Sequence, residues 1–175
     1  MAKHRKVTIK GEHKVPIDCQ ALRKLILYYY KGKNNIELNF DDRIYAWANH
    51  CYDSSIKTHI ITMSPKRCSY CRLDTLRYDY ENLSIYQSLT LLNEYDMTYR
   101  IIASLLHELK HAMQCDANPI RYAKCQDDKH PVLKNPHLRY KYSVLETEAE
   151  GWALLNLHKA IERYEQWCDE GRSDT

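Results

Sequence analysis

The sequence has no apolar run long enough for a membrane-spanning segment. Its longest apolar stretches are residues 25–30 and 101–106, far shorter than the roughly 20 residues with which a helix crosses a bilayer. The basic residues 1–6 lead into Val7-Thr8-Ile9-Lys10 instead of the apolar core of a secretory signal. We therefore expect no membrane anchor and no secretory signal, and we take a cytoplasmic, reducing location as the default.

A large excess of charge of one sign is also missing. The chain carries 26 Lys and Arg residues against 23 Asp and Glu residues, a formal net charge of +3 over 175 residues. Surfaces that bind nucleic acid need a concentrated basic patch or stripe, whereas the basic residues here are scattered along the chain. Nucleic acid is therefore not indicated as a partner.

Linkers, internal repeats and low-complexity tracts are absent from the sequence. The composition, 44% hydrophobic and 28% charged, is that of an ordinary globular domain, and the length suits one domain. We predict a single domain over residues 1–175. An insertion of loops and short pieces is expected at about residues 66–95, where hydrophobic periodicity is weak.

The cysteines do not form a complete motif of any common kind. They number seven: Cys19, Cys51, Cys68, Cys71, Cys115, Cys125 and Cys168. An odd count in a reducing compartment argues against a disulfide framework. Cys68 and Cys71 have the spacing of a metal or redox pair, but no second Cys-x-x-Cys accompanies them. A second, structural zinc ion at this pair would need isolated cysteines recruited in space, so free thiols are favoured.

Hydrophobic periodicity predicts an α+β fold. Three helices are expected, at residues 19–31, 97–114 and 143–168. Strands are expected at residues 36–40, 45–52 and 58–63, the last two forming a hairpin. Asp18 is the predicted N-cap of the first helix and Gly32 ends it. Residues 116–142 contain three prolines and are predicted to be mainly loop, with room for a short helix.

The middle helix contains the pentapeptide HELKH, residues 107–111. His107 and His111 are four residues apart, so on a helix they lie on one face, one turn from each other. A single tetrahedral metal ion can therefore take a ring nitrogen from each, while Glu108 points at the open side of the ion. HELKH thus predicts two thirds of a metal-ligand set.

A catalytic zinc ion needs three protein ligands and one open position. The last predicted helix starts with Glu146, Glu148 and Glu150. Glu146 and Glu150 share a face, so either can be the ligand while the other holds the remaining N–H of a histidine. Glu148 projects to the opposite side and is expected to be solvated. Ser143 and Glu146 also form a capping box, in which Glu146 would fold back to the backbone of Ser143.

His107-Glu108-x-x-His111 followed by Glu146-x-x-Ala149-Glu150 resembles the glutamate-zincins, the thermolysin-like superfamily of zinc metallopeptidases. The resemblance implies a zincin-like fold, with a small mixed or antiparallel sheet packed on the HExxH helix and on a C-terminal helix that carries the third ligand. It implies His107, His111 and Glu146 as zinc ligands and Glu150 as an acid that orients a ligand. It also implies that an edge strand, predicted at residues 58–63, positions the substrate. Glu150 stands where aspartate is more usual.

The resemblance further implies a reaction. Zinc lowers the pKa of a bound water, and Glu108 accepts the proton as that water attacks a peptide carbonyl. Candidate donors for the oxyanion are His137, Tyr140 and Tyr142, which lie just before the third-ligand helix. The expected substrate is a protein or peptide.

Two alternatives remain at this stage. The chain could be a zincin-fold regulatory or binding protein that holds zinc with little turnover. It could also be a structural-zinc protein built around Cys68 and Cys71, in which HELKH is incidental. His137 and the two tyrosines fit ordinary positions on a loop surface equally well.

Overall fold

The N-terminal half of the chain forms a four-stranded mixed sheet. Its strands are β1 (Val7–Lys10), β2 (Asn35–Phe40), β3 (Ala48–Asp53) and β4 (Thr58–Met63), in the spatial order β1-β2-β4-β3. β1, β2 and β4 run parallel, whereas β3 is antiparallel to β4. This computed structural model describes residues 5–44, 48–66, 97–127 and 143–173. Within them β3 and β1 are the edge strands.

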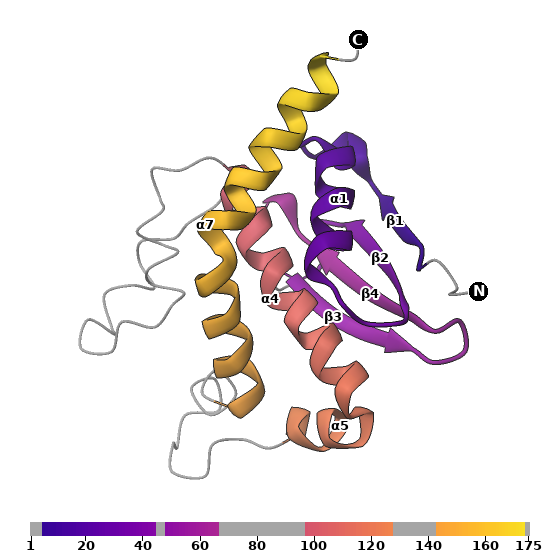
Figure 1. Cartoon of the computed structure of the whole chain (residues 1–175). Coiled ribbons are helices and arrows are strands. Elements are labelled where there is room, and N and C mark those ends of the chain that lie inside the picture. The colour runs from indigo at the N-terminus through magenta and orange to yellow at the C-terminus, as the bar shows by residue number, and fades with distance from the viewer. Residues whose placement is uncertain (1–4, 45–47, 67–96, 128–142, 174–175) are drawn as a thin grey trace.

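The alternation of side chains gives the sheet one apolar face. In β2, Ile36, Leu38 and Phe40 are buried and the residues between them are partly exposed. The register places Leu38 opposite Ile61 and Phe40 opposite Met63. Because residues two apart on a strand point to the same side, these buried side chains line a single face. The helices cover that face (Figure 1).

The first helix, α1 (Cys19–Tyr29), begins and ends with side-chain contacts to its free backbone groups. The Asp18 carboxylate accepts hydrogen bonds from two backbone N–H groups of the first turn, at 2.8 and 2.9 Å. Such an N-cap contributes about 1 kcal/mol. At the other end the Arg5 guanidinium donates to the Tyr30 carbonyl at 2.5 Å. Along the chain, α1 connects β1 to the parallel strand β2.

The remaining helices are α4 (Met97–Ala117), α5 (Pro119–Asp127) and α7 (Val144–Ser173), with a short 3-10 helix, η1 (Glu12–Lys14), after β1. α4 crosses the sheet over β3 and β4, and α7 packs against both α4 and α1. Figure 1 shows α4 and α7 side by side over the sheet. α4 is therefore buried between α7 and the strands, and one long stretch of it, residues 101–109, is buried throughout.

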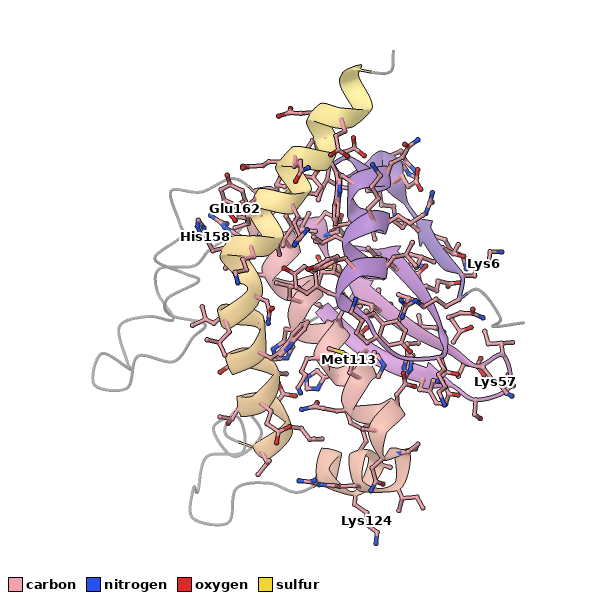
Figure 2. The ribbon with its side chains drawn as sticks, viewed as in Figure 1. Lys6, Lys57, Met113, Lys124, His158 and Glu162 are labelled. Carbon is pink, nitrogen blue, oxygen red and sulfur yellow. The ribbon has the colours of Figure 1, made fainter. Side chains whose placement is uncertain are left out.

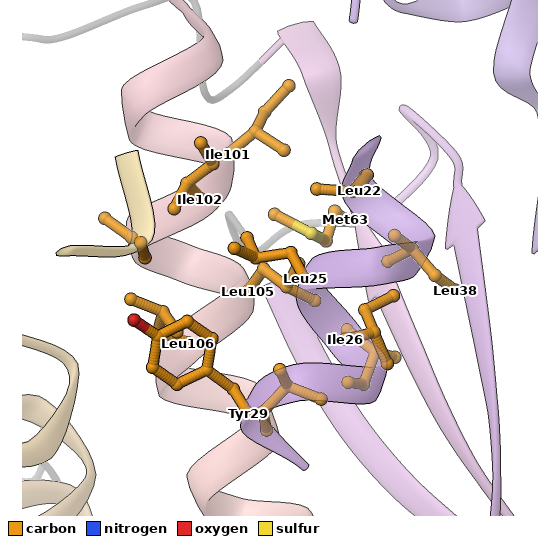
Figure 3. Close-up of a cluster of buried hydrophobic side chains, with 14 of the residues drawn as sticks. Leu22, Leu25, Ile26, Tyr29, Leu38, Met63, Ile101, Ile102, Leu105 and Leu106 are labelled. Carbon is orange, nitrogen blue, oxygen red and sulfur yellow. The ribbon is translucent and has the colours of Figure 1, made fainter. Parts of the chain in front are cut away.

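Apolar side chains fill the space between α1, α4 and the sheet (Figure 3). The largest fully buried ones include Leu22, Leu25, Ile26, Leu38, Ile61, Met63, Ile101, Ile102, Leu105 and Leu106. Burying each such side chain stabilises the fold by about 1.5–3 kcal/mol relative to its exposure. A second, smaller cluster of Cys115, Tyr122 and Leu145 joins the C-terminal part of α4 to α5 and α7. This second cluster lies in the part of the fold that carries the candidate site.

The predicted helices, the strand at residues 36–40 and the hairpin are confirmed, with shifted ends. The short helix expected within residues 116–142 is α5. β1 was not predicted from the sequence, because it has only four residues and follows a run of basic ones. The assignment of the substrate-positioning edge to residues 58–63 is wrong, since β4 is an interior strand and β3 is the edge.

Several sequence predictions fall on residues outside the described part of the chain. They concern most of the insertion at residues 66–95, the pair Cys68 and Cys71, and the three candidate oxyanion donors His137, Tyr140 and Tyr142. Among the helices that are described, none is both long and apolar enough to cross a membrane.

Candidate metal centre

α4 and α7 bring three ligand-type side chains together. His107 Nε2 lies 3.2 Å from Glu146 Oε2, and His111 Nε2 lies 3.2 Å from Glu146 Oε1. The two histidine Nε2 atoms are 3.0 Å apart. The histidines come from successive turns of α4 and the glutamate from the first turn of α7. Within the described residues, this is the group of His, Cys, Asp and Glu side chains that could hold a metal ion.

The spacing of these atoms suits a small tetrahedral site. Ligand bonds of about 2.0–2.1 Å place neighbouring tetrahedral ligand atoms about 3.3 Å apart. The observed separations of 3.0 and 3.2 Å are close to that value. One metal ion could therefore bind His107, His111 and Glu146 together, with only small movements of their side chains.

His107 and His111 are buried and Glu146 is half-buried, and the charges of these groups interact. Burial acts to raise the pKa of Glu146, but the hydrogen bonds and charges of His107 and His111 outweigh it and hold that pKa well below its ordinary value. Burial acts to lower the pKa of His111, but its contacts with Glu146 and the charge of Glu108 raise it overall. Glu146 is therefore a carboxylate at neutral pH, the form that ligates metal.

Glu108 is buried beside this group. Glu108 is 6% exposed. Burial raises the pKa of its carboxyl group, the charge of Glu146 adds to the rise, and the two histidines oppose it. Glu108 is therefore a buried carboxyl group next to the candidate ligands, with a higher proton affinity than an exposed glutamate.

The sequence left two roles open for Glu146, as a metal ligand or as part of a capping box with Ser143. The first turn of α7 shows which of them its side chain takes. The Glu146 backbone N–H donates to Ser143 Oγ at 3.4 Å, so Ser143 does cap the helix. The Glu146 carboxylate faces the histidines instead of folding back to Ser143. Glu150 is buried but lies outside the candidate ligand group, and Glu148 is exposed as expected. The role of Glu150 as an acid that orients a ligand histidine stays a prediction.

Sequence reasoning missed the partner of the second histidine. His111 Nδ1 lies 2.8 Å from Gln114 Oε1, whereas we expected a glutamate of α7 to hold a histidine N–H. Gln114 Nε2 in turn donates to the Leu145 carbonyl and to Glu148, both at 3.1 Å. The spacing of Gln114, three residues after His111, was the available signal, since residues three apart share a helix face.

A chain of hydrogen-bonded polar groups, some buried and some half-buried, begins next to the candidate metal centre. The Tyr122 ring lies beside that of His111, with centroids 6.1 Å apart, and its hydroxyl is 3.0 Å from His50 Nδ1. His50 Nε2 is 2.9 Å from His59 Nδ1, and His59 Nε2 is 2.9 Å from Asp116 Oδ1. The chain runs from α5 through β3 and β4 back to α4.

The directions of these hydrogen bonds follow from the chemistry of the groups. Burial lowers the pKa of His50 to about 3 and also lowers that of His59, so both rings are neutral at pH 7. The carboxylate of Asp116 can only accept, so His59 donates from Nε2 and accepts at Nδ1. His50 then donates from Nε2 and accepts at Nδ1 from the Tyr122 hydroxyl. These groups therefore form a hydrogen-bonded chain and not a second ligand group.

Comparison of the chain with protein-family models, curated proteins and solved structures finds no match.

Proposed function

We propose that this protein is a zinc-dependent metallopeptidase with a zincin-like fold, which hydrolyses a peptide bond in a protein or peptide substrate. The observation that carries the proposal is the convergence of His107, His111 and Glu146 next to the buried Glu108. Three protein ligands and a nearby carboxyl group are the minimal protein parts for metal-assisted hydrolysis. The resemblance of the two motifs to those of the glutamate-zincins supports the same reading.

The donor set favours zinc among the common divalent ions. Two imidazole nitrogens and one carboxylate match the ligands of catalytic zinc sites, whereas magnesium and calcium prefer all-oxygen surroundings. Only three protein ligands come together among the described residues, which leaves room for water or substrate at the ion. When bound, zinc would lower the pKa of a water molecule and polarise the substrate carbonyl.

Glu108 supplies the proton transfers in this proposal. It accepts the proton of the attacking water and delivers that proton to the leaving amine, so the peptide bond breaks without a charged amide leaving group. Burial raises the pKa of Glu108, which makes its carboxylate a stronger base than that of an exposed glutamate. His107 and Glu108 are adjacent on α4, so the helix itself fixes the distance between ligand and base.

The position of β3 supports an extended peptide substrate. β3 is an edge strand of the described sheet and contacts α4, the helix with the two histidines. An extended peptide can add to an exposed edge through main-chain hydrogen bonds. We propose that β3, and not β4, positions the substrate.

The test compares two variants of the centre, one single and one double, with two matched controls. Glu108→Gln should retain bound zinc and lower hydrolysis by about 10²–10⁴-fold, the usual contribution of a general base. His107→Ala combined with His111→Ala should lose both zinc and hydrolysis. His158→Ala and Glu162→Gln are the controls, because these residues pair with each other at 3.2 Å on the exposed side of α7 (Figure 2).

Zinc is measured by elemental analysis of the purified proteins, and hydrolysis by mass spectrometry of new termini in a peptide library. Equal hydrolysis by wild type and Glu108→Gln would rule out the proposed base. Retention of zinc by the double-histidine variant would place the metal elsewhere in the chain. A wild-type protein that binds zinc at the histidines yet cleaves no peptide would contradict the peptidase proposal and favour a binding role.

A further inference from the structure

We propose that Gln114 is the positioning residue of the metal centre, which orients His111 on α4 and at the same time sets the first turn of α7 that carries Glu146. This inference rests on the proposed metal-binding role of the centre. It goes beyond that role because it names the group that couples ligands from two different helices.

The first part of the argument concerns the tautomer of His111. Its Nδ1 lies 2.8 Å from Gln114 Oε1. An amide oxygen accepts hydrogen bonds and cannot donate them, so the hydrogen of the neutral ring sits on Nδ1. The lone pair is then on Nε2, which faces His107 Nε2 at 3.0 Å and Glu146 Oε1 at 3.2 Å. Gln114 thus presents the ligating nitrogen to the centre.

The orientation of the Gln114 amide is determined by its other contacts. Its nitrogen lies 3.1 Å from the Leu145 carbonyl oxygen and 3.1 Å from Glu148 Oε2. Both of these atoms are acceptors, so the amide NH₂ must face them and the amide oxygen must face His111. The reversed amide would place an oxygen against two other oxygens. All polar groups of this side chain therefore support a single orientation.

The second part concerns the link between the helices. Leu145 immediately precedes Glu146 and is buried against Cys115 and Tyr122. Its carbonyl belongs to the first turn of α7, so a hydrogen bond from Gln114 fixes the position of that turn along the axis of α4. One side chain on α4 therefore holds both a ligand of its own helix and the backbone next to the ligand of the other helix.

The fold itself does not depend on this one side chain. α4 and α7 pack along most of their length through apolar residues, among them Leu105, Leu106, Ala153 and Leu157. Loss of the Gln114 hydrogen bonds should therefore loosen the centre without separating the helices. Removing the hydrogen-bond partner of a ligating histidine typically lowers metal affinity about 10–100-fold.

The experiment measures zinc affinity of the full chain by competition with a chromophoric chelator, below the melting temperature of each metal-free variant. We expect Gln114→Leu, which loses all three hydrogen bonds of this side chain, to bind zinc about 10–100-fold more weakly than wild type. Gln114→Glu keeps an acceptor for the His111 hydrogen but loses the donors to Leu145 and Glu148, so its zinc affinity should fall between those of wild type and Gln114→Leu. Gln166→Leu is the matched control, because Gln166 donates to Glu170 on the exposed surface of α7 and should leave affinity unchanged.

The d–d absorption spectrum of the cobalt-substituted protein gives a second readout, since it reports ligand geometry and not global stability. It should shift in Gln114→Leu and stay unchanged in Gln166→Leu. Wild-type affinity and spectrum in Gln114→Leu would overturn the inference, and so would equal losses in Gln114→Leu and Gln114→Glu. Failure of the wild-type protein itself to bind zinc through His107 and His111 would instead reject the proposed function.

Discussion

Asp116, on the C-terminal turn of the helix that carries HELKH, accepts a hydrogen bond from the buried His59 of β4, with 2.9 Å between Oδ1 and Nε2. The same carboxylate also accepts from the Tyr30 hydroxyl and from the Asn34 amide, each at 2.5 Å. α4 is thus tied to the interior of the sheet one turn beyond His111. The candidate metal centre therefore sits on a helix whose position is fixed by polar contacts as well as by the apolar core.

Glu146 and Glu150 of α7 should differ in their effect on metal binding. Glu146→Gln removes a ligand and should weaken zinc binding by more than the roughly 10–100-fold that is typical of residues behind the ligands. Glu150→Gln changes a buried residue outside the ligand group and should weaken it by no more than that range. Isothermal titration of the metal-free proteins with zinc measures both. The opposite ranking would make Glu150 the third ligand.

Protein stability should fall with decreasing pH in a way that depends on His50. Burial lowers the pKa of His50 to about 3, with the charges of His59 and His111 adding to this effect and Asp116 opposing it. The unfolded chain takes up a proton at this residue below pH about 6.5, whereas the folded protein leaves it neutral down to pH about 3. The unfolded state then binds more protons, so acid destabilises the fold across this window by up to about 1.4 kcal/mol per pH unit.

His50→Gln removes this titration and keeps an amide that can hydrogen-bond in place of the ring. Its free energy of unfolding, measured by urea denaturation with a chelator present, should decline less steeply than that of wild type between pH 6.5 and 4. His158→Gln, at an exposed position, should follow the wild-type slope. Parallel curves for His50→Gln and wild type would show that His50 is not held neutral by the fold.

Two glycines should respond in opposite directions to the same substitution. A Cβ at Gly151, inside α7, would meet nothing within 4 Å, so Gly151→Ala should stabilise the protein by up to about 1 kcal/mol through helix propensity and the unfolded chain. A Cβ at Gly32 would overlap Asp116 Oδ2 and the Tyr30 ring and hydroxyl. Gly32→Ala should therefore cost about 1–3 kcal/mol. Thermal or urea unfolding measures the stability of both variants. A stabilising Gly32→Ala would mean that the Asp116 side chain moves aside at little cost in free energy.

The hairpin shows which features of the fold could be predicted from the sequence and which could not. Alternation correctly predicted that residues 58–63 form a strand after a turn, because that pattern is local. Which strand of the hairpin pairs with β2 depends on contacts between distant segments. β4 takes the interior place because its buried Thr58, His59, Ile61 and Met63 meet β2 and the core, whereas Asn49 and Cys51 of β3 are exposed.

The amino-acid sequence by itself determined the local parts of the site. His107, Glu108 and His111 lie on the same side of a helix because a helical turn has 3.6 residues. Apolar periodicity alone predicts that helix. Only the tertiary structure decided the approach of Glu146, the hydrogen bonds of Gln114 to His111 and Leu145, and the hydrogen-bonded chain from Tyr122 to Asp116. Each of these requires α7, α5 or a strand to pack against α4, and such long-range packing leaves no periodic signal along the chain.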